Sequence, residues 1–194
     1  MREHEVEATW TTAAGDRTEV VSFGWENGGW TIDGRIAVTG GGGDRGGRDD
    51  VHYVVRTDAE WRVRQFLLFR DEDDPDLWLA TDGEGRWGEV NGAWREDLTG
   101  CRDVELVVTP MGHTVAVRRS ALAVGELEDA LVASVDPETL QVSVVARRTT
   151  RVDEQRWRFE SSVAGDETGT VVHVVVDEHG LLLEDEHGRF RRER

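Results

Sequence analysis

Alternation of apolar and polar residues, interrupted at short intervals by turn-forming sequences, is the dominant feature of this chain. Runs rich in β-branched and aromatic residues recur from the start, at 6–10, 30–38, 52–57, 61–69 and 77–81. Turn sequences separate these and later runs, with ENGG at 26–29, DGEG at 82–85, NG at 91–92 and DEHG at 177–180. A period of two is typical of strands with one buried face, and such turns join antiparallel neighbours. The pattern predicts an all-β fold with an antiparallel sheet of about ten strands, curled or closed.

Helical character is confined to one place. The segment GELEDALVAS at 125–134 could form a short helix, whereas residues 140–185 have the pattern of a strand meander. We therefore expect at most one or two short helices. A chain of 194 residues is long enough to bury a core, and eight tryptophans add much apolar area. We expect one domain, spanning 1–194.

The charge of the chain narrows its partners. There are 40 acidic residues against 23 basic ones, every basic residue is arginine, and the net charge is -17. Such a charge repels nucleic acid and anionic membrane surfaces, so neither is an expected partner. Exclusion of lysine beside abundant Asp and Glu indicates adaptation to a high-salt cytoplasm, where self-repulsion is screened. The alternative is an acidic protein from a GC-rich genome in which arginine has replaced lysine.

The sequence favours a cytoplasmic location. Apolar stretches are far shorter than the ~18 residues of a membrane span, and MREHEVEATW has no signal-peptide core. The single cysteine, Cys101, excludes an internal disulfide and agrees with a reducing compartment.

Two motifs suggest binding chemistry at first sight. TGGGGDRGGRDD at 39–50 is glycine-rich, but it precedes a strand pattern and lacks the helix and Lys-Ser/Thr of a phosphate loop. DEHG occurs twice, at 177–180 and 185–188. The two copies are separated by roughly 20 Å if the LLLE between them is a strand. We interpret these motifs as loops and solvated turns, and expect neither a metal site nor a cofactor.

An arginine pair poses a structural question. In CRDVELVVTPMGHTVAVRRSALAVG at 101–125, alternation resumes after a Thr-Pro and ends at Arg118 and Arg119. If this segment is a strand, one of the two arginines faces inward. Asp103 and Glu105 are then its nearest acidic candidates. The inward arginine either locks the fold by ion pairing or contacts an anionic or sugar headgroup.

Catalytic residues do not stand out. Cys101 and His113 could act as nucleophile and base, although a lone cysteine before an alternating strand is more often a small buried residue. The chain has no GxSxG elbow, and its many carboxylates present no distinct acid–base pair. We therefore assign no catalytic residue.

Seven short motifs in a fixed order carry a family resemblance. They are GW-x-I-x-G at 29–34, Y-x-V-x-x-D-x-x-W-R-x-R at 53–64, RW-x-x-x-NG at 86–92, GC-x-DVEL-x-x-TP at 100–110, T-x-x-V-RR-x-x-L-AVG at 114–125, RWRFES at 156–161 and VD-x-x-GLLL at 176–183. Together they resemble the "putative glycolipid-binding" family of prokaryotic proteins, from about residue 20 to 190; the composition suggests a salt-adapted, for example haloarchaeal, member. The resemblance implies a spiral β-roll, a single long antiparallel sheet curled into an incomplete barrel around a cavity, similar in shape to bacterial lipoprotein carriers. It also implies binding of a lipid or glycolipid.

These observations lead to two hypotheses and a set of candidate residues. The first is a non-enzymatic binder with an apolar tail among Trp, Val and Leu and a polar head near the arginines. The second is an enzyme acting on a small metabolite, and a structural or interaction role is a further alternative. A deep apolar cavity with no histidine in it would favour the binder, whereas a polar pocket joining His113 to an inward carboxylate or to Cys101 would favour the enzyme. The candidate ligand-binding residues are Arg118, Arg119, His113, Asp103, Trp30, Trp61, Tyr53 and Trp87, with at least two of the three tryptophans facing the interior. The oligomeric state stays open.

Overall fold

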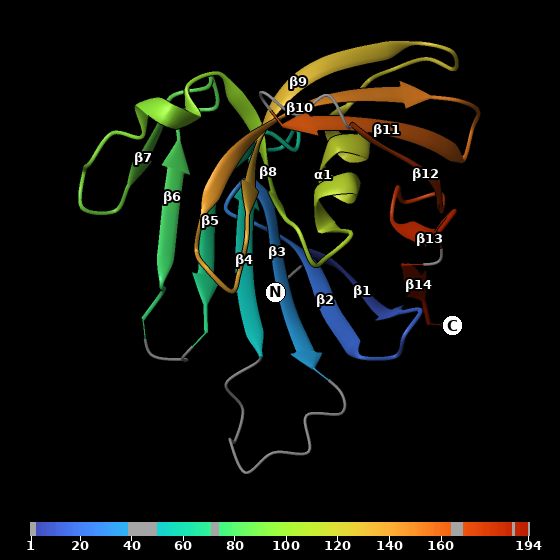
Figure 1. Cartoon of the computed structure of the whole chain (residues 1–194), viewed down its shortest axis with the longest axis horizontal. Helices are drawn as coiled ribbons and strands as arrows, with labels where there is room; N and C mark the ends of the chain where they lie inside the picture. Colours follow the sequence, from blue (N-terminus) through green and yellow to red (C-terminus); the bar gives the residue numbers. More distant parts are fainter. Residues whose placement is uncertain (1–2, 39–49, 71–73, 164–168, 188, 194) are drawn as a thin grey trace.

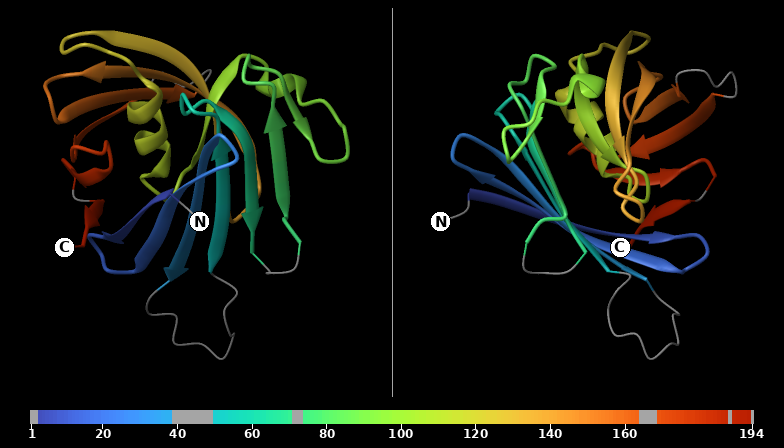
Figure 2. Two further views of the ribbon diagram at one scale, coloured as in Figure 1. Left: turned by 180° about the vertical axis from the view of Figure 1, so that it is seen from behind. Right: turned by 60° about the vertical axis from the view of Figure 1, so that its left-hand side comes forward.

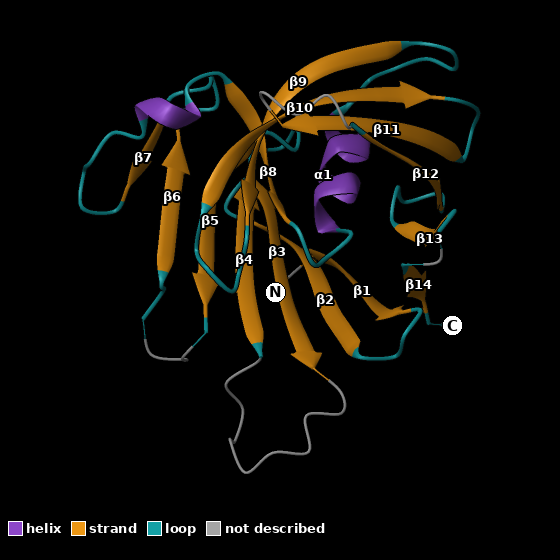
Figure 3. Cartoon of the chain, in the orientation of Figure 1, coloured by secondary structure: helices purple, strands orange, loops and turns teal. Residues whose placement is uncertain are grey.

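The fold is built on one very large sheet. The computed structural model describes residues 3–38, 50–70, 74–163, 169–187 and 189–193, and their strands form a 14-stranded sheet (Figures 1 and 3). The strands are β1 (Glu3–Thr12), β2 (Arg17–Glu26), β3 (Gly29–Val38), β4 (Val51–Thr57), β5 (Val63–Phe69), β6 (Leu77–Thr81), β7 (Trp87–Glu89), β8 (Cys101–Leu106), β9 (Leu127–Val135), β10 (Val142–Arg151), β11 (Arg156–Val163), β12 (Thr170–Val176), β13 (Leu182–Asp185) and β14 (Phe190–Arg192). A short 3₁₀ helix, η1 (Glu96–Leu98), and one α-helix, α1 (Met111–Arg119), complete the described elements.

The sheet is two meanders joined at their ends. Its order is β7-β6-β5-β4-β3-β2-β1-β14-β13-β12-β11-β10-β9-β8, so β1 pairs with β14 while β7 and β8 are the edges. Nearly all neighbours are antiparallel, and the sheet curls without closing (Figure 2). The Asn27-Gly28 turn between β2 and β3 has positive φ at both residues, as a two-residue hairpin of type I′ requires. The predicted curled all-β sheet is confirmed.

One pair of strands departs from this plan. β8 and β9 are parallel, with Glu105 opposite Ser134 and Leu106 opposite Val135. Parallel strands need a crossover, and α1 provides it. The sheet therefore ends in a single β-α-β unit, which the prediction of a wholly antiparallel sheet did not include.

The prediction of a strand through Arg118 and Arg119 is wrong, because residues 111–119 form α1. Pro110 precedes its first residue, and the two arginines lie in its last turn, where cations favour the helix dipole. Four consecutive residues of this segment, 114–117, are buried. Tertiary packing of this kind stabilises a helix that is only nine residues long.

The predicted helix at 125–134 is also wrong. These residues contribute β9, which pairs with β8 on one side and β10 on the other. A strand in this position has both backbone edges hydrogen-bonded, and its C-terminal half, Val132–Val135, is buried. Two-sided pairing therefore outweighs the weak helix preference of ELEDAL.

The curled sheet encloses α1. Figure 2 shows β1–β5 and β9–β12 as two facing parts, with α1 between them. Met111 and Val115 of α1 belong to one hydrophobic core together with Phe23, Ile32 and Phe159 of the sheet. The helix thus fills part of the interior that the resemblance implied would be a cavity. The glycine-rich stretch at 39–49 lies outside the described residues.

Within the described part of the chain, no helix has the length and apolar character needed to cross a membrane.

Candidate functional site

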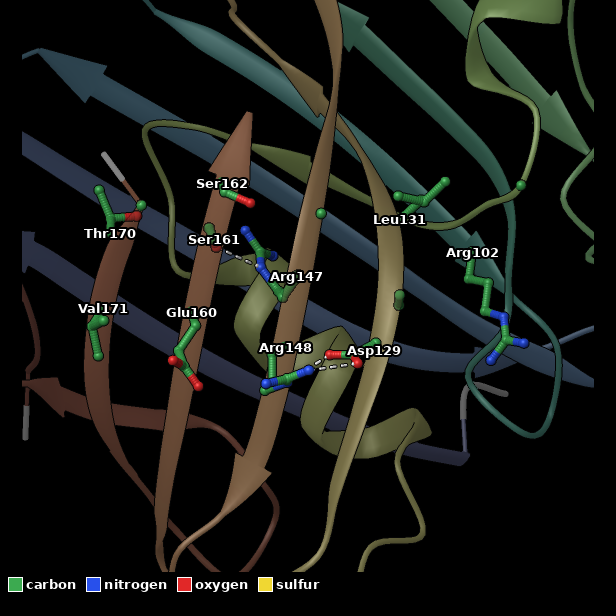
Figure 4. A pocket seen from close by; sticks show the side chains of 14 residues that line it. Arg102, Asp129, Leu131, Arg147, Arg148, Glu160, Ser161, Ser162, Thr170 and Val171 are labelled. Atoms are coloured by element: carbon green, nitrogen blue, oxygen red, sulfur yellow. Dashed lines mark hydrogen bonds and ion pairs between the residues drawn. The ribbon is translucent and has the colours of Figure 1, made fainter. Parts of the chain in front are cut away.

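Two hollows lie on opposite faces of the strands β9–β12. The adjacent arginines Arg147 and Arg148 of β10 point to opposite faces of the sheet (Figure 4). Arg147 is 6% exposed and faces α1, whereas the Arg148 side chain is 49% exposed on the outer face. We call the hollow beside Arg147 the inner pocket and the hollow beside Arg148 the outer groove.

The inner pocket has a volume of about 250 Å³. Its walls come from β8, α1, β10, β11 and β12 and from the segment that leads into β14. Its polar residues include Glu105, His113, Arg147, Ser161 and Arg189. Segments far apart in the sequence meet here because the curl of the sheet brings β14 and β8 to the same end of α1.

Arg147 is the central polar group of the inner pocket. Its guanidinium forms an ion pair with Glu105 of β8, and its Nε donates to Ser161 Oγ at 3.1 Å. Burial opposes ionisation of Glu105, but Arg147 outweighs this effect and lowers the pKa of Glu105. The pair is therefore a buried, fully ionised group whose geometry is set from both sides.

His113 forms the helix side of the inner pocket. Its ring lies against Phe159, with 4.5 Å between ring centroids, and its Nδ1 is buried without a hydrogen-bond partner in the described chain. Burial, followed by the nearby Arg147, lowers the pKa of His113 to about 3. The imidazole is therefore neutral at physiological pH.

An apolar rim adjoins these polar groups. Val107 and Val163 both line the inner pocket and are 54% and 47% exposed. Phe190 lines it as well and is partly buried. The inner pocket thus places polar, buried groups at its base and exposed aliphatic side chains at its edge. This division suits an amphipathic ligand.

The outer groove is larger, at about 640 Å³ (Figure 4). Arg147 and Ser161 line it as well as the inner pocket, but the charged side chains of its outer face are exposed. Arg148 forms a bidentate pair with Asp129, at 2.8 and 2.9 Å, and these side chains are 49% and 61% exposed. Glu160 and Leu131 also face this groove. Water already satisfies such groups, so the outer groove offers a ligand less than the buried groups of the inner pocket do.

The sequence candidates Arg119 and Asp103 do meet. Arg119 Nε and Nη2 each donate to Asp103 at 2.9 Å, and Nη2 also donates to Glu128 at 2.7 Å. The Asp103 side chain is only 4% exposed. Of the two acidic candidates, Asp103 therefore pairs with Arg119, whereas Glu105 pairs with Arg147.

Arg118, Trp30 and Trp61 form a second cluster, at the C-terminal end of α1. The Arg118 guanidinium lies over Trp61 at 4.7 Å and over Trp30 at 5.7 Å, and the two indoles stack at 5.1 Å. Trp61 is 6% exposed and has a positive φ of 64°, which is costly for a bulky residue. The cluster joins α1 to the sheet and to the turn before β5.

Tyr53 belongs to a buried network. Its hydroxyl donates to Glu19 of β2, which also lies 2.6 and 2.7 Å from the Thr109 hydroxyl. Burial of the carboxylate raises the pKa of Glu19 to about 7. The Tyr53 ring passes over Gly34, where a Cβ would lie only 2.2 Å from the ring. This network connects the sheet to the turn that precedes α1.

Trp87 and Cys101 are core residues. Trp87 is 1% exposed, and its indole N–H donates to the Cys101 carbonyl at 2.8 Å. Burial raises the pKa of the Cys101 thiol to about 11, so the nucleophilic thiolate is scarce. Cys101 does not line the inner pocket, whereas His113 does.

The DEHG segments form turns in the described residues. Asp177 Oδ1 accepts the backbone N–H groups of His179 and Leu181, and Asp185 Oδ1 accepts that of Arg189. In the described ranges, no group of three or more His, Cys, Asp and Glu residues could hold a metal ion.

Of the eight candidates from the sequence, the inner pocket contains His113 alone. Trp61 and Trp87 are buried, and Trp30 is partly buried. Sequence reasoning missed Arg147, although VVARRTT at 144–150 carried the relevant signal. It is an alternating strand with two adjacent arginines, so one of them must face inward.

These features define an all-β protein with one long curled sheet, an enclosed helix and a small amphipathic pocket. The sequence model of the family described as "Putative glycolipid-binding" matches residues 7–192, and the chain belongs to this family. A crystal structure of a DUF1089 family protein from Pseudomonas aeruginosa is similar, with a TM-score of 0.68 and 21% identity. The similarity covers 100% of this chain and 94% of that chain, and at this identity it shows the fold alone. A comparison with curated proteins gave no match.

Proposed function

We propose that this protein is a non-enzymatic binder of a glycolipid, with the sugar headgroup in the inner pocket and the chain of the lipid against its rim. One observation carries the proposal. The buried Arg147, held by Glu105 and Ser161, lies in the same small pocket as the exposed valines Val107 and Val163. Guanidinium, carboxylate and hydroxyl groups exchange hydrogen bonds with sugar hydroxyls, while the valines can cover an alkyl chain.

The size of the inner pocket supports placing only the headgroup of the ligand inside it. Its volume of about 250 Å³ is just below the range for small-molecule sites, which measure about 300–1,000 Å³. A headgroup fits such a volume and a whole lipid does not. The tail therefore lies at the surface, and not in the interior, which α1 partly fills.

Octyl β-D-glucoside, below its micellar concentration, is a suitable probe for isothermal titration calorimetry. Tetraethylene glycol monooctyl ether has the same chain without the sugar, and glucose has the sugar without the chain. We expect octyl glucoside to bind at least about tenfold more tightly than either control, which corresponds to about 1.4 kcal/mol. Equal affinity for octyl glucoside and the ether would contradict the proposal.

A pair of variants locates the binding. Arg147→Met combined with Glu105→Leu removes both charges of the buried pair, so no uncompensated charge remains and the fold is retained. This double variant is expected to bind octyl glucoside no more tightly than tetraethylene glycol monooctyl ether. Arg148→Met changes the adjacent arginine on the outer face, and this variant is expected to bind octyl glucoside more tightly than the ether, as the wild type does.

A second candidate function is an enzyme, because the inner pocket joins His113 to the inward carboxylate Glu105. Two facts weaken it: with a pKa near 3, His113 is a weak base, and Glu105 is engaged by Arg147. Mass spectrometry of octyl glucoside after prolonged incubation distinguishes the two functions. A binder returns the glycoside intact, whereas released glucose would establish the enzyme.

A further inference from the structure

Both cations that line the inner pocket have a carboxylate nearby in the described residues. Arg147 is paired with the lining residue Glu105. The Arg189 side chain is 51% exposed and lies 3.4 Å from Asp185, which is 1% exposed and is not part of the pocket lining. His113 adds no charge, because its imidazole is neutral. Each cation of the pocket wall therefore has a carboxylate beside it.

Such a pocket receives charged and uncharged headgroups very differently. A phosphate or carboxylate needs a cation that is free to pair with it, and here it would have to compete with Glu105 for Arg147. A hydroxyl group needs no such competition, since it can donate to a carboxylate oxygen or accept from a guanidinium N–H. The neutral imidazole of His113, partly exposed at the pocket wall, offers one more hydrogen bond to a hydroxyl.

The charge of the whole chain acts in the same direction. At -17 it repels an approaching anion from a distance, independently of the contacts within the pocket. From the paired charges of the pocket wall, we infer that the inner pocket selects an uncharged sugar headgroup and rejects anionic headgroups such as a uronic acid or a phosphate. This inference rests on the proposed function and specifies its ligand class.

Octyl β-D-glucuronide tests the inference, because it differs from octyl β-D-glucoside only in having a carboxylate in place of the CH₂OH group. Titrations in 1 M KCl, where the screening length is about 3 Å, remove most of the long-range repulsion and leave the contacts in the pocket. We expect wild-type protein to bind the glucoside at least about tenfold more tightly than the glucuronide, a difference of about 1.4 kcal/mol.

Glu105→Gln should change this preference. It releases Arg147 from its carboxylate. The ratio of the affinity for the glucoside to the affinity for the glucuronide is therefore expected to fall by about tenfold or to reverse. Glu160→Gln, on the outer face of β11, removes the same charge from the other side of the sheet and is expected to keep the wild-type preference. If Glu160→Gln narrows the gap as much as Glu105→Gln does, net charge and not the pocket is responsible, and the inference is overturned.

The wild-type titrations decide the matter even if Glu105→Gln fails to fold. Equal or tighter binding of the glucuronide overturns the inference and leaves the proposed function standing, since a glycoside still binds. Failure of both glycosides to bind better than tetraethylene glycol monooctyl ether overturns the proposed function and this inference together.

Discussion

Glu19 shows how a single residue couples the sheet to the helix. Its carboxyl group is 4% exposed, and its polar contacts, the hydroxyls of Tyr53 and Thr109, are uncharged. Thr109 also accepts the backbone N–H of Met111, the first residue of α1. The protonation of Glu19 therefore bears on the anchoring of the helix N-terminus.

Stability should depend on pH through Glu19. The folded protein retains the Glu19 proton up to about pH 7, whereas the unfolded chain releases it near the ordinary pKa of 4.5. The tighter binding of this proton in the folded state adds to the free energy of unfolding. The added stability is fully present below pH 4.5 and is lost as pH rises toward 7, by up to about 1.4 kcal/mol per pH unit. Glu19→Gln cannot titrate. Urea unfolding of both proteins from pH 4.5 to 7 should give a wild-type-minus-variant difference that falls with pH, and a constant difference would contradict the assignment.

At the scale of elements, α1 is held by two unlike arginines. Arg119 joins it to β8 and β9 through Asp103 and Glu128, in a largely buried cluster. Arg118 joins it to the opposite part of the sheet by stacking on Trp61 and Trp30. A helix of nine residues is too short to be stable alone, so these contacts and its buried face maintain it.

Arg119→Ala should be more damaging than Arg118→Ala. It leaves Asp103 buried without its cation, at a cost of roughly 3 to 5 kcal/mol in the free energy of unfolding. Arg118→Ala loses only cation–π contacts and stem packing, at about 1 to 2 kcal/mol. Denaturant unfolding followed by circular dichroism measures both.

Arg148→Ala is the matched control for Arg119→Ala. Arg148 and Asp129 form the same bidentate pair on the exposed face, where solvent weakens it, so we expect a much smaller loss than for Arg119→Ala. If Arg119→Ala and Arg148→Ala lowered the free energy of unfolding by similar amounts, burial would not be the reason that the Arg119 ion pairs stabilise the protein.

At the scale of the whole molecule, one open sheet carries an excess of negative charge. With 40 acidic and 23 basic residues, repulsion acts across the entire surface of the folded chain. Surface ion pairs such as Arg148–Asp129 offset little of it, because solvent weakens them. We propose that the protein is adapted to a cytoplasm of high salt concentration.

This proposal predicts that the thermal midpoint rises with KCl. Between about 0.05 and 1 M KCl the screening length shrinks to about 3 Å, and the self-repulsion of the folded state is largely removed. Differential scanning calorimetry across this range measures the effect. A midpoint that stays level or falls would favour the alternative, in which arginine has replaced lysine for reasons of genome composition.

The sequence by itself determined the class of fold, because the signals for it are local. Alternation in segments such as 30–38 and turn residues such as Asn27-Gly28 act within a few positions, and both have their predicted roles in the structure. The sequence also named Asp103 and Glu105 as the candidate partners of an inward arginine, and Arg119 pairs with Asp103, although the segment carrying Arg119 is helical.

Tertiary structure alone decided what depends on distant partners. Residues 111–119, predicted as a strand, form α1 because they are buried between the parts of the sheet. Residues 125–134, predicted as a helix, contribute to β9 because they pair with strands on both sides. The inner pocket could not be predicted, since Glu105, Arg147 and Arg189 meet only after the sheet has curled. Alternation shows that one of two adjacent arginines faces inward, but the curl of the sheet determines which groups it meets there. The physical reason is that periodicity is a property of neighbours in sequence, whereas a binding site is a property of neighbours in space.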